Sequence, residues 1–274
     1  MVEADQQFDF IICAQKAINQ SSIPPQIELG VDEKKTTIVL IQNGVGNEEP
    51  FRKRFPRTTI LSCVVRRAPI NTSIIFTDSL FQTWVGARQP QPGVITHTKS
   101  ENMQIGLYPN EARRASMETG RLEKFGALLD AGKTVFEVVS DVQVQRWEKV
   151  VWNAAWNSLT TLTLMDTHAW LSSSEDATRL TKKLMREIIS VARALGLPIG
   201  YELIDKLMDK IWSMAPIGSS MRTDYENGKP MEVDIILGYP VRKGKELGID
   251  MGTAETIYII LSAINKRLMD RTKG

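Results

Sequence analysis

Cysteine and histidine are scarce in this sequence. The chain has two cysteines, Cys13 and Cys63, and two histidines, His97 and His168. Two cysteines give no disulfide framework, and both lie in apolar, strand-like runs. We therefore interpret them as small buried hydrophobic residues of a protein kept in a reducing compartment. With so few histidine and cysteine ligands available, we expect no metal site.

Long apolar runs and an excess of one charge are also missing. The formal net charge is +2, from 34 basic and 32 acidic side chains, and no basic stripe suggests a nucleic-acid partner. No run approaches the ~18 apolar residues of a membrane span, and the polar, acidic stretch from Met1 to Phe8 has no signal core. We therefore predict a cytoplasmic protein that binds neither membranes nor nucleic acids.

The first half of the chain contains three short, nearly continuous apolar runs, Phe8–Cys13, Thr36–Ile41 and Thr58–Val65. Such runs are typical of strands buried on both faces. About 20 to 25 residues separate successive runs, which suits a crossover connection between parallel strands. Further strands are predicted at Ser73–Thr77, Gln82–Val85 and Val135–Val139, and a turn at Gln89–Gly93.

The second half has helical periodicity instead. Gly132 is suited to end a helix over Glu111–Ala131. The other predicted helices are Asp141–Met165, a helix capped by Ser172–Glu175 that ends at Gly196, Tyr201–Met214, Met231–Leu247 and Thr253–Met269. The expected fold class is therefore α/β plus all-α, with an α/β domain over residues 1–140 and a helical domain over residues 141–274. Clefts between two such domains commonly bind ligands.

The segment Trp147–Leu162 carries the most informative polar pattern. Lys149, Asn153 and Asn157 recur at i, i+4 and i+8, so they share one face of a helix that is otherwise strongly apolar. A polar stripe on a buried helix must be satisfied internally or line a cavity. One amine and two amides suit a small ligand with carbonyl, hydroxyl or carboxylate oxygens. A structural polar network, or a lysine reaching to solvent, would fit the spacing as well.

Two loops add weaker signals. Ser219–Asp224 is a polar turn leading into a short helix, and Glu232 is expected in the first turn of the next helix, where a capping role is a fair alternative. Gln42–Gly46 follows a strand and resembles a phosphate-binding loop. However, the third glycine of such a motif would fall at Glu49, beside Glu48, and two carboxylates repel phosphate. We expect its glycines to form a tight turn close to a ligand.

Taken in order, these segments resemble the ketopantoate reductases. The resemblance rests on FDFIICAQKA, IVLIQNGVGNEE, WEKVVWNAAWNSLTTL and SSMRTDYENGKPMEVDIILGYPVRKGKELGI, which run nearly the whole length of the chain. It implies an oxidoreductase that reduces 2-dehydropantoate, or a related small keto acid or carbonyl compound, with NADPH, as in pantothenate biosynthesis. It also implies that Lys149 is the general acid that protonates the carbonyl oxygen.

The resemblance implies roles for six further residues. Asn153 and Asn157 match asparagines that hold the substrate, and Ser220 matches a serine that contacts its carboxylate. Glu232 matches a catalytic glutamate near the nicotinamide ribose and the lysine. Asn43 and Lys16 match positions on the cofactor side of the cleft.

The sequence departs from the family pattern at its start. Family members begin with a strand, a G-x-G-x-x-G loop and a helix, whereas only seven residues precede Phe8 here and no glycine occurs before Gly30. The resemblance therefore implies an N-terminally truncated Rossmann-like sheet. The strand Phe8–Cys13 would then lie at an open edge, to be covered by a partner such as a second subunit, by a local rearrangement, or by a segment absent from this chain.

Two other functions compete with that of an NADPH-dependent reductase. The chain would be redox-silent if the Lys149 cleft served acid/base chemistry, such as cyclisation or isomerisation of a carbonyl compound in specialised metabolism. It would be a non-catalytic binding protein if the helical domain served mainly for dimerisation. The motif residues Lys149, Asn153, Asn157, Ser220 and Glu232 favour the reductase.

Overall fold

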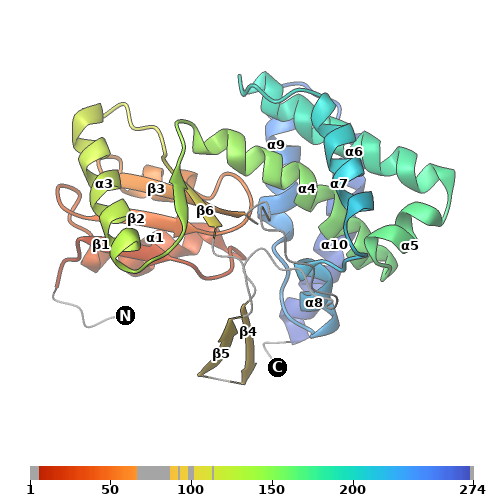
Figure 1. Cartoon of the computed structure of the whole chain (residues 1–274), viewed down its shortest axis with the longest axis horizontal. Helices are drawn as coiled ribbons and strands as arrows, with labels where there is room; N and C mark the ends of the chain where they lie inside the picture. Colours follow the sequence, from red (N-terminus) through yellow and green to blue (C-terminus); the bar gives the residue numbers. More distant parts are fainter. Residues whose placement is uncertain (1–5, 67–86, 92, 98–101, 113, 272–274) are drawn as a thin grey trace, which may run out of the picture. The chain divides into compact units, whose positions relative to one another are not determined.

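The computed structural model describes residues 6–66, 87–91, 93–97, 102–112 and 114–271 (Figure 1). The predicted strands Ser73–Thr77 and Gln82–Val85 lie outside these residues. The chain divides into two compact units. A sheet unit comprises residues 1–42 and 46–145, and a helical unit comprises residues 146–274 together with Asn43–Val45. A three-residue loop between two parts of the sheet unit is therefore grouped with the helices.

The sheet unit is built on five strands in the order β1-β2-β3-β6-β7. Their bounds are Phe10–Cys13, Thr37–Ile41, Thr59–Arg66, Asn102–Leu107 and Phe136–Val138. The pairs β1–β2, β2–β3 and β6–β7 are parallel, which confirms the predicted sheet, and β3–β6 is antiparallel. The strand β6 was not predicted, because its apolar residues alternate with polar ones instead of forming a continuous run.

Apolar side chains pack on both faces of the central strands. On one face, Cys13, Ile38, Leu40 and Ile60 join residues of the helices α1 (Ile23–Ile27) and α2 (Glu49–Arg54). On the other, Val39, Leu61, Cys63 and Ile105 join Leu122 and Phe125 of α3 (Ala115–Ala131). Burial on both faces explains the continuous apolar runs of β2 and β3. It also confirms that the two cysteines are buried.

The crossover from β1 to β2 has a helical middle part. It contains the 3-10 turns Gln20–Ser22 and Glu28–Gly30 on either side of α1. Among the described strands, β1 lies at one edge of the sheet, and Ile12 at its centre is 56% exposed. In the described part of the chain, β1 is therefore an edge strand, as the family resemblance implies.

A separate hairpin corrects one prediction. Gln89–Gly93 was expected to be a turn, but Gln89, Pro90 and Gln91 belong to β4 (Ala87–Gln91), which pairs antiparallel with β5 (Val94–His97). The ladder is irregular between Arg88 and Gln91, so Pro90 falls where no regular backbone donor is needed. Gly93, with φ +81°, takes part in the turn itself.

The helical unit consists of α4 to α10. Their bounds are Val142–Thr163, Thr167–Ser172, Glu175–Ala194, Glu202–Ser213, Ser220–Glu226, Tyr239–Glu246 and Gly252–Arg271. Ser174 caps α6, accepting a hydrogen bond from the Ala177 amide at 3.1 Å, which confirms the predicted start. The short helix α5, capped by Asp166, was not predicted. The helix expected at Glu111 begins four residues later, at Ala115.

The predicted helix Met231–Leu247 is wrong in its first turns. A π-helix over Asp234–Gly238 precedes α9. At Gly238, an added Cβ would lie 2.5 Å from Oδ1 of Asp234 and 2.7 Å from the ring of Tyr258, so only glycine allows α10 to approach the π-helix this closely. π-Helical turns are rare and occur frequently at functional sites.

A buried carboxylate joins two of the longer helices. Glu187 on α6 is 7% exposed and accepts hydrogen bonds from the backbone amides of Thr253, at 3.2 Å, and Ala254, at 2.8 Å, in the first turn of α10. A carboxylate is favoured at a helix start, where backbone N–H groups lack partners within the helix. This contact fixes α10 against α6.

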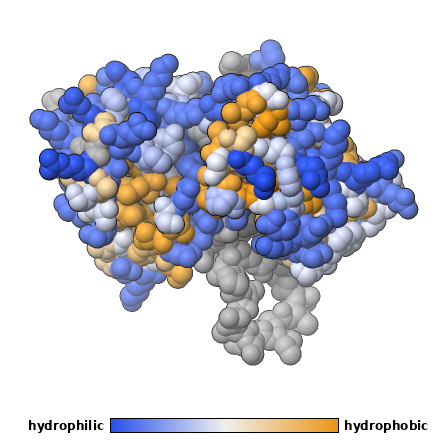
Figure 2. Space-filling model, turned by 90° about the horizontal axis from the view of Figure 1, so that it is seen from above, coloured by the Kyte–Doolittle hydropathy of each residue, from blue (hydrophilic) through white to orange (hydrophobic). Residues whose placement is uncertain are grey.

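The face seen in Figure 2 is mostly hydrophilic, with apolar patches between the charged side chains. Exposed apolar residues of α10 include Ile259 and Ile260, at 59% and 46%. Within the described residues, no helix combines the length and apolarity needed to cross a bilayer.

Candidate active site

The polar stripe predicted on α4 is buried. Lys149, Asn153 and Asn157 are only 8%, 4% and 6% exposed. Their spacing places them along one face of the helix. A buried amine and two buried amides require polar partners, from the protein or from a ligand.

The remainder of α4 is a rigid apolar support for this stripe. Val150, Val151, Ala154 and Ala155 are fully buried, and the rings of Trp152 and Trp156 meet edge to face at 5.8 Å. Near the end of the helix, the hydroxyl groups of Ser158, Thr160 and Thr161 bond to carbonyl oxygens one turn earlier. The helix therefore holds the polar stripe in a well-packed environment.

Asn43 and Glu232 meet in the helical unit. The Nδ2 atom of Asn43 donates to Oε2 of Glu232 at 3.1 Å. Glu232 is 8% exposed. The expectation that Glu232 lies in the first turn of a helix is wrong, since it precedes the π-helix. It is therefore positioned by the segment Met231–Val233 and by Asn43.

The turn that carries Asn43 is shaped by protein contacts. Gly44 has φ +84° and Gly46 has φ +77°, which confirms a glycine-dependent turn. An added Cβ at Gly44 would lie 2.6 Å from Cβ, Cδ1 and the carbonyl oxygen of Ile235, in the π-helix. The absence of a side chain at Gly44 thus allows Ile235 to approach closely.

Ser220 is the first residue of α8, and its side chain is exposed. Its neighbour Ser219 is the N-cap and accepts from the Arg222 amide at 3.0 Å. The hydroxyl oxygens of Ser219 and Thr160 lie 2.8 Å apart, and Ser219 Oγ lies 3.5 Å from the carbonyl oxygen of Asn157. Ser219 thus fixes the start of α8, and with it Ser220, against α4 beside Asn157.

Lys16 belongs to the sheet unit, just after the carboxyl end of β1, and is exposed. Beside it, the Gln42 amide donates to the carbonyl oxygen of Gln15 at 2.9 Å and is bonded to Gln20. Ligands of parallel α/β sheets bind at the carboxyl ends of the strands. Lys16 is therefore in a place where it can contact a bound cofactor.

The fit of the sheet unit to a dinucleotide is partial. Lys16 supplies a cation suited to a phosphate, but the start of α2 carries Glu49 in its first turn and the buried Glu48 as its N-cap residue. Ser62 and Gln143 donate to the Glu48 carboxylate at 2.6 Å and 3.1 Å. Two carboxylates at a helix start disfavour a phosphate there. Among the described residues, a cofactor contact in this unit is therefore expected at Lys16 and not at α2.

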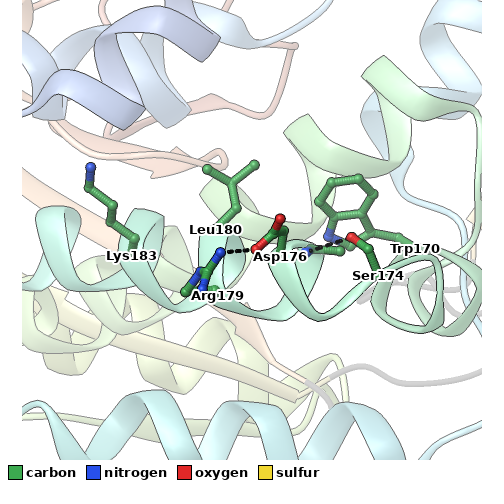
Figure 3. A pocket seen from close by; sticks show the side chains of 7 residues that line it. Trp170, Ser174, Asp176, Arg179, Leu180 and Lys183 are labelled. Carbon is green, nitrogen blue, oxygen red and sulfur yellow. Dashed lines mark hydrogen bonds and ion pairs between the residues drawn. The ribbon is translucent and has the colours of Figure 1, made fainter.

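A shallow pocket of about 430 Å³ on α5 and α6 is separate from these residues (Figure 3). Three of its polar side chains have structural partners: Ser174 caps α6, and Arg179 pairs with Asp176. None of the predicted site residues lines it. In the part of the chain that the structure describes, no three metal-binding side chains are grouped together.

Two family models match this sequence. The model described as ketopantoate reductase PanE/ApbA covers residues 2–72, and the one for its C-terminal part covers residues 141–265. The chain belongs to the ketopantoate reductase family. The family predicted from the sequence is confirmed, and so is the predicted fold class.

Curated members of the family are similar over most of this chain. The 2-dehydropantoate 2-reductase of Nostoc sp. is 25% identical over 259 residues, which cover 94% of this chain and 75% of that protein. The 2-dehydropantoate 2-reductase of Halobacterium salinarum is 26% identical over 80% of this chain, and the match spans 64% of its own length. The relatives are thus longer than this chain.

Solved structures have the same fold. The 2-dehydropantoate 2-reductase of Methylococcus capsulatus superposes with a TM-score of 0.79 at 26% identity, covering 97% of this chain and 77% of that one. A D-mandelate dehydrogenase solved with NADH and anilino(oxo)acetate gives a TM-score of 0.74 at 20% identity, covering 96% and 78%. At that identity, the second comparison supports the fold alone.

Proposed function

We propose that this protein reduces a small 2-keto acid, such as 2-dehydropantoate, to the corresponding 2-hydroxy acid. The observation that carries the proposal is the buried stripe of Lys149, Asn153 and Asn157 in a member of the ketopantoate reductase family. NADPH, when bound, supplies the hydride. The other requirements of the reaction are a proton for the carbonyl oxygen and groups that orient the substrate.

Lys149 meets the first requirement. As hydride reaches the carbonyl carbon, negative charge develops on the carbonyl oxygen, and the ammonium group of Lys149 donates a proton to it. The low polarity around a buried ammonium strengthens its interaction with this developing charge. Lys149 becomes a neutral amine and recovers its proton from solvent after the hydroxy acid leaves.

The remaining residues orient the substrate. Asn153 and Asn157 can each donate and accept a hydrogen bond, so they suit a keto acid with further oxygen groups. Ser220, exposed at the start of α8, is proposed to contact the carboxylate. Glu232 and Asn43 form the pair proposed to lie next to the nicotinamide ribose.

The test is a titration of the purified chain with NADPH by calorimetry, with NADH as a control, followed by an assay of NADPH oxidation with 2-dehydropantoate and other 2-keto acids. Micromolar binding of NADPH and loss of its absorbance only when a keto acid is present would support the proposal. Turnover of a carbonyl substrate without any nicotinamide would replace it with the redox-silent acid/base function.

Self-association as a homodimer is also part of the proposal. A structurally similar ketopantoate reductase from Staphylococcus aureus, 22% identical, is described as dimeric. Light scattering on the purified chain would decide between a dimer and a monomer.

A further inference from the structure

The Asn43–Glu232 pair joins two segments that are far apart in the sequence, so each segment needs a support that keeps it in place. Asn43 lies in the loop after β2, yet the Asn43–Val45 segment groups with the helical unit. Glu232 lies in the segment between α8 and the π-helix. Neither residue belongs to a regular helix or strand that would fix it.

Arg146 supports the Asn43 segment. Its side chain is 2% exposed, and its Nη1 atom donates to the carbonyl oxygen of Gly44 at 2.9 Å. On the same segment, the Val45 amide donates to the carbonyl oxygen of Ile235 at 3.1 Å. A buried guanidinium on a backbone carbonyl is a charge-assisted hydrogen bond, stronger than a neutral one. The segment is therefore held by α4 and by the π-helix.

Arg146 also extends the polar stripe of α4. It precedes Lys149 by three residues, so the two side chains lie on neighbouring positions of one helix face. The same face of the helix thus presents the proposed general acid and the group that holds the Asn43 loop.

Asn265 supports the Glu232 segment from α10. Its Oδ1 atom accepts from the Met231 amide at 2.8 Å, and its Nδ2 atom donates to the Met231 carbonyl oxygen at 3.1 Å. Both backbone groups of the residue before Glu232 are thereby bonded to one side chain. This two-point contact fixes the peptide from which the Glu232 side chain projects.

We propose that Arg146 and Asn265 are positioning residues that hold Asn43 and Glu232 together for the reaction. The expected effect on kcat rests on the proposed function. The support of the Asn43 and Glu232 segments by Arg146 and Asn265 does not depend on it. It adds to the site two residues that act without contacting the substrate or the cofactor. Their effect is exerted through the backbone of Gly44 and of Met231.

The test combines a local and a catalytic measurement on the full chain. The variants are Arg146→Lys, Asn265→Leu and Gly44→Ala. The third variant displaces the Asn43 loop without changing Arg146, because the added Cβ would lie 2.6 Å from Ile235. The control is Arg193→Lys, since Arg193 also donates to a backbone carbonyl, that of Ile199, but on α6. Hydrogen exchange of the Val45 amide and kcat and KM for the keto acid are measured for each.

In Arg146→Lys and Gly44→Ala, exchange at Val45 should rise about tenfold or more, and kcat should fall by a similar factor while KM changes little. Asn265→Leu should lower kcat in the same way and increase exchange at Met231. Arg193→Lys should change neither local exchange nor kcat. The proposal would be overturned if the exchange rate of the Val45 amide were unchanged in both Arg146→Lys and Gly44→Ala. It would also be overturned if exchange rose in the variants while kcat stayed at the wild-type value.

The two proposals fail in different ways. If the wild-type chain neither binds nor reduces a keto acid while Arg146→Lys still loosens Val45, the proposed function fails and the coupling of the loop to Arg146 is supported. If the wild type is active and the loosened variants are equally active, the positioning role fails and the reductase function is supported.

Discussion

The side-chain amide of Asn43 donates to the carboxylate of Glu232 at 3.1 Å across 189 positions of sequence. An amide donor that is partly buried and a buried carboxylate acceptor form a charge-assisted bond. Because the carboxylate is buried, the loss of this donor removes a charge-assisted hydrogen bond that water does not readily replace. The pair is therefore open to a direct test by substitution.

Replacement of Asn43 by Asp should impair the enzyme more than replacement by Ala. The aspartate places a second carboxylate against Glu232, where like charges repel. A hydrogen bond to a charged group contributes about 1.5 to 3 kcal/mol, so kcat/KM should fall about tenfold to a hundredfold. The measurement is steady-state kinetics, with thermal unfolding as a check on folding.

A reciprocal variant sharpens this prediction. Asn43→Asp combined with Glu232→Gln restores an amide–carboxylate pair with the roles exchanged, so stability should recover while activity does not if Glu232 acts chemically. Asn227→Asp is the matched control, because Asn227 is exposed and its side-chain amide donates to the carbonyl oxygen of Thr223. Equal effects of Asn43→Asp and Asn227→Asp would contradict a role for the pair.

Lys149→Met should abolish most of the turnover without unfolding the protein. Methionine keeps the unbranched apolar part of the side chain and removes the ammonium, which leaves the carbonyl oxygen without its proton donor. Loss of a general acid typically lowers kcat by about 10² to 10⁴. Calorimetry with the keto acid and single-turnover kinetics would separate a chemical defect from weak binding.

The control for Lys149→Met is Lys206→Met on α7, since Lys206 is exposed. That variant should retain the wild-type kcat. Should Lys149→Met retain full turnover, the proton must come from another group, and the assignment of the general acid would be wrong.

The sequence was sufficient for features with a local signal. Continuous apolar runs identified β1, β2 and β3, and the i, i+4, i+8 spacing identified the polar stripe on α4. Arg146 was missed, although it lies on the same helix face three residues before Lys149. An extension of the stripe by one turn would have included it.

Other features depend on contacts that no local pattern records. The need for glycine at position 238 depends on the approach of Tyr258, and the need for glycine at position 44 depends on Ile235. Likewise, the two bonds of Asn265 to Met231 join α10 to a segment 34 positions away. Propensity and periodicity describe neighbours along the chain, so these long-range contacts required the structure.

Stability should fall in alkaline solution because of a buried thiol in the sheet unit. Burial raises the pKa of Cys13 from its ordinary value of 9.0 to about 11. Below pH 9 the thiol is protonated in both the folded and the unfolded chain and has no effect on the pH dependence. Between pH 9 and 11 only the unfolded chain loses the proton, so the free energy of unfolding decreases with rising pH, by on the order of 2 kcal/mol in all.

Tyr108 should add to this loss at still higher pH. Burial, followed by the nearby carboxylates of Glu48 and Glu49, raises the pKa of Tyr108 from 10.0 to about 12. The contribution of Cys13 can be separated by Cys13→Ala, which lowers stability at neutral pH through lost packing but has no thiol to titrate. Urea denaturation from pH 8 to 11 should therefore show a shallower decline for Cys13→Ala than for the wild type. Parallel declines would mean that the thiol is already ionised in the folded protein, or that its burial is lost before it titrates.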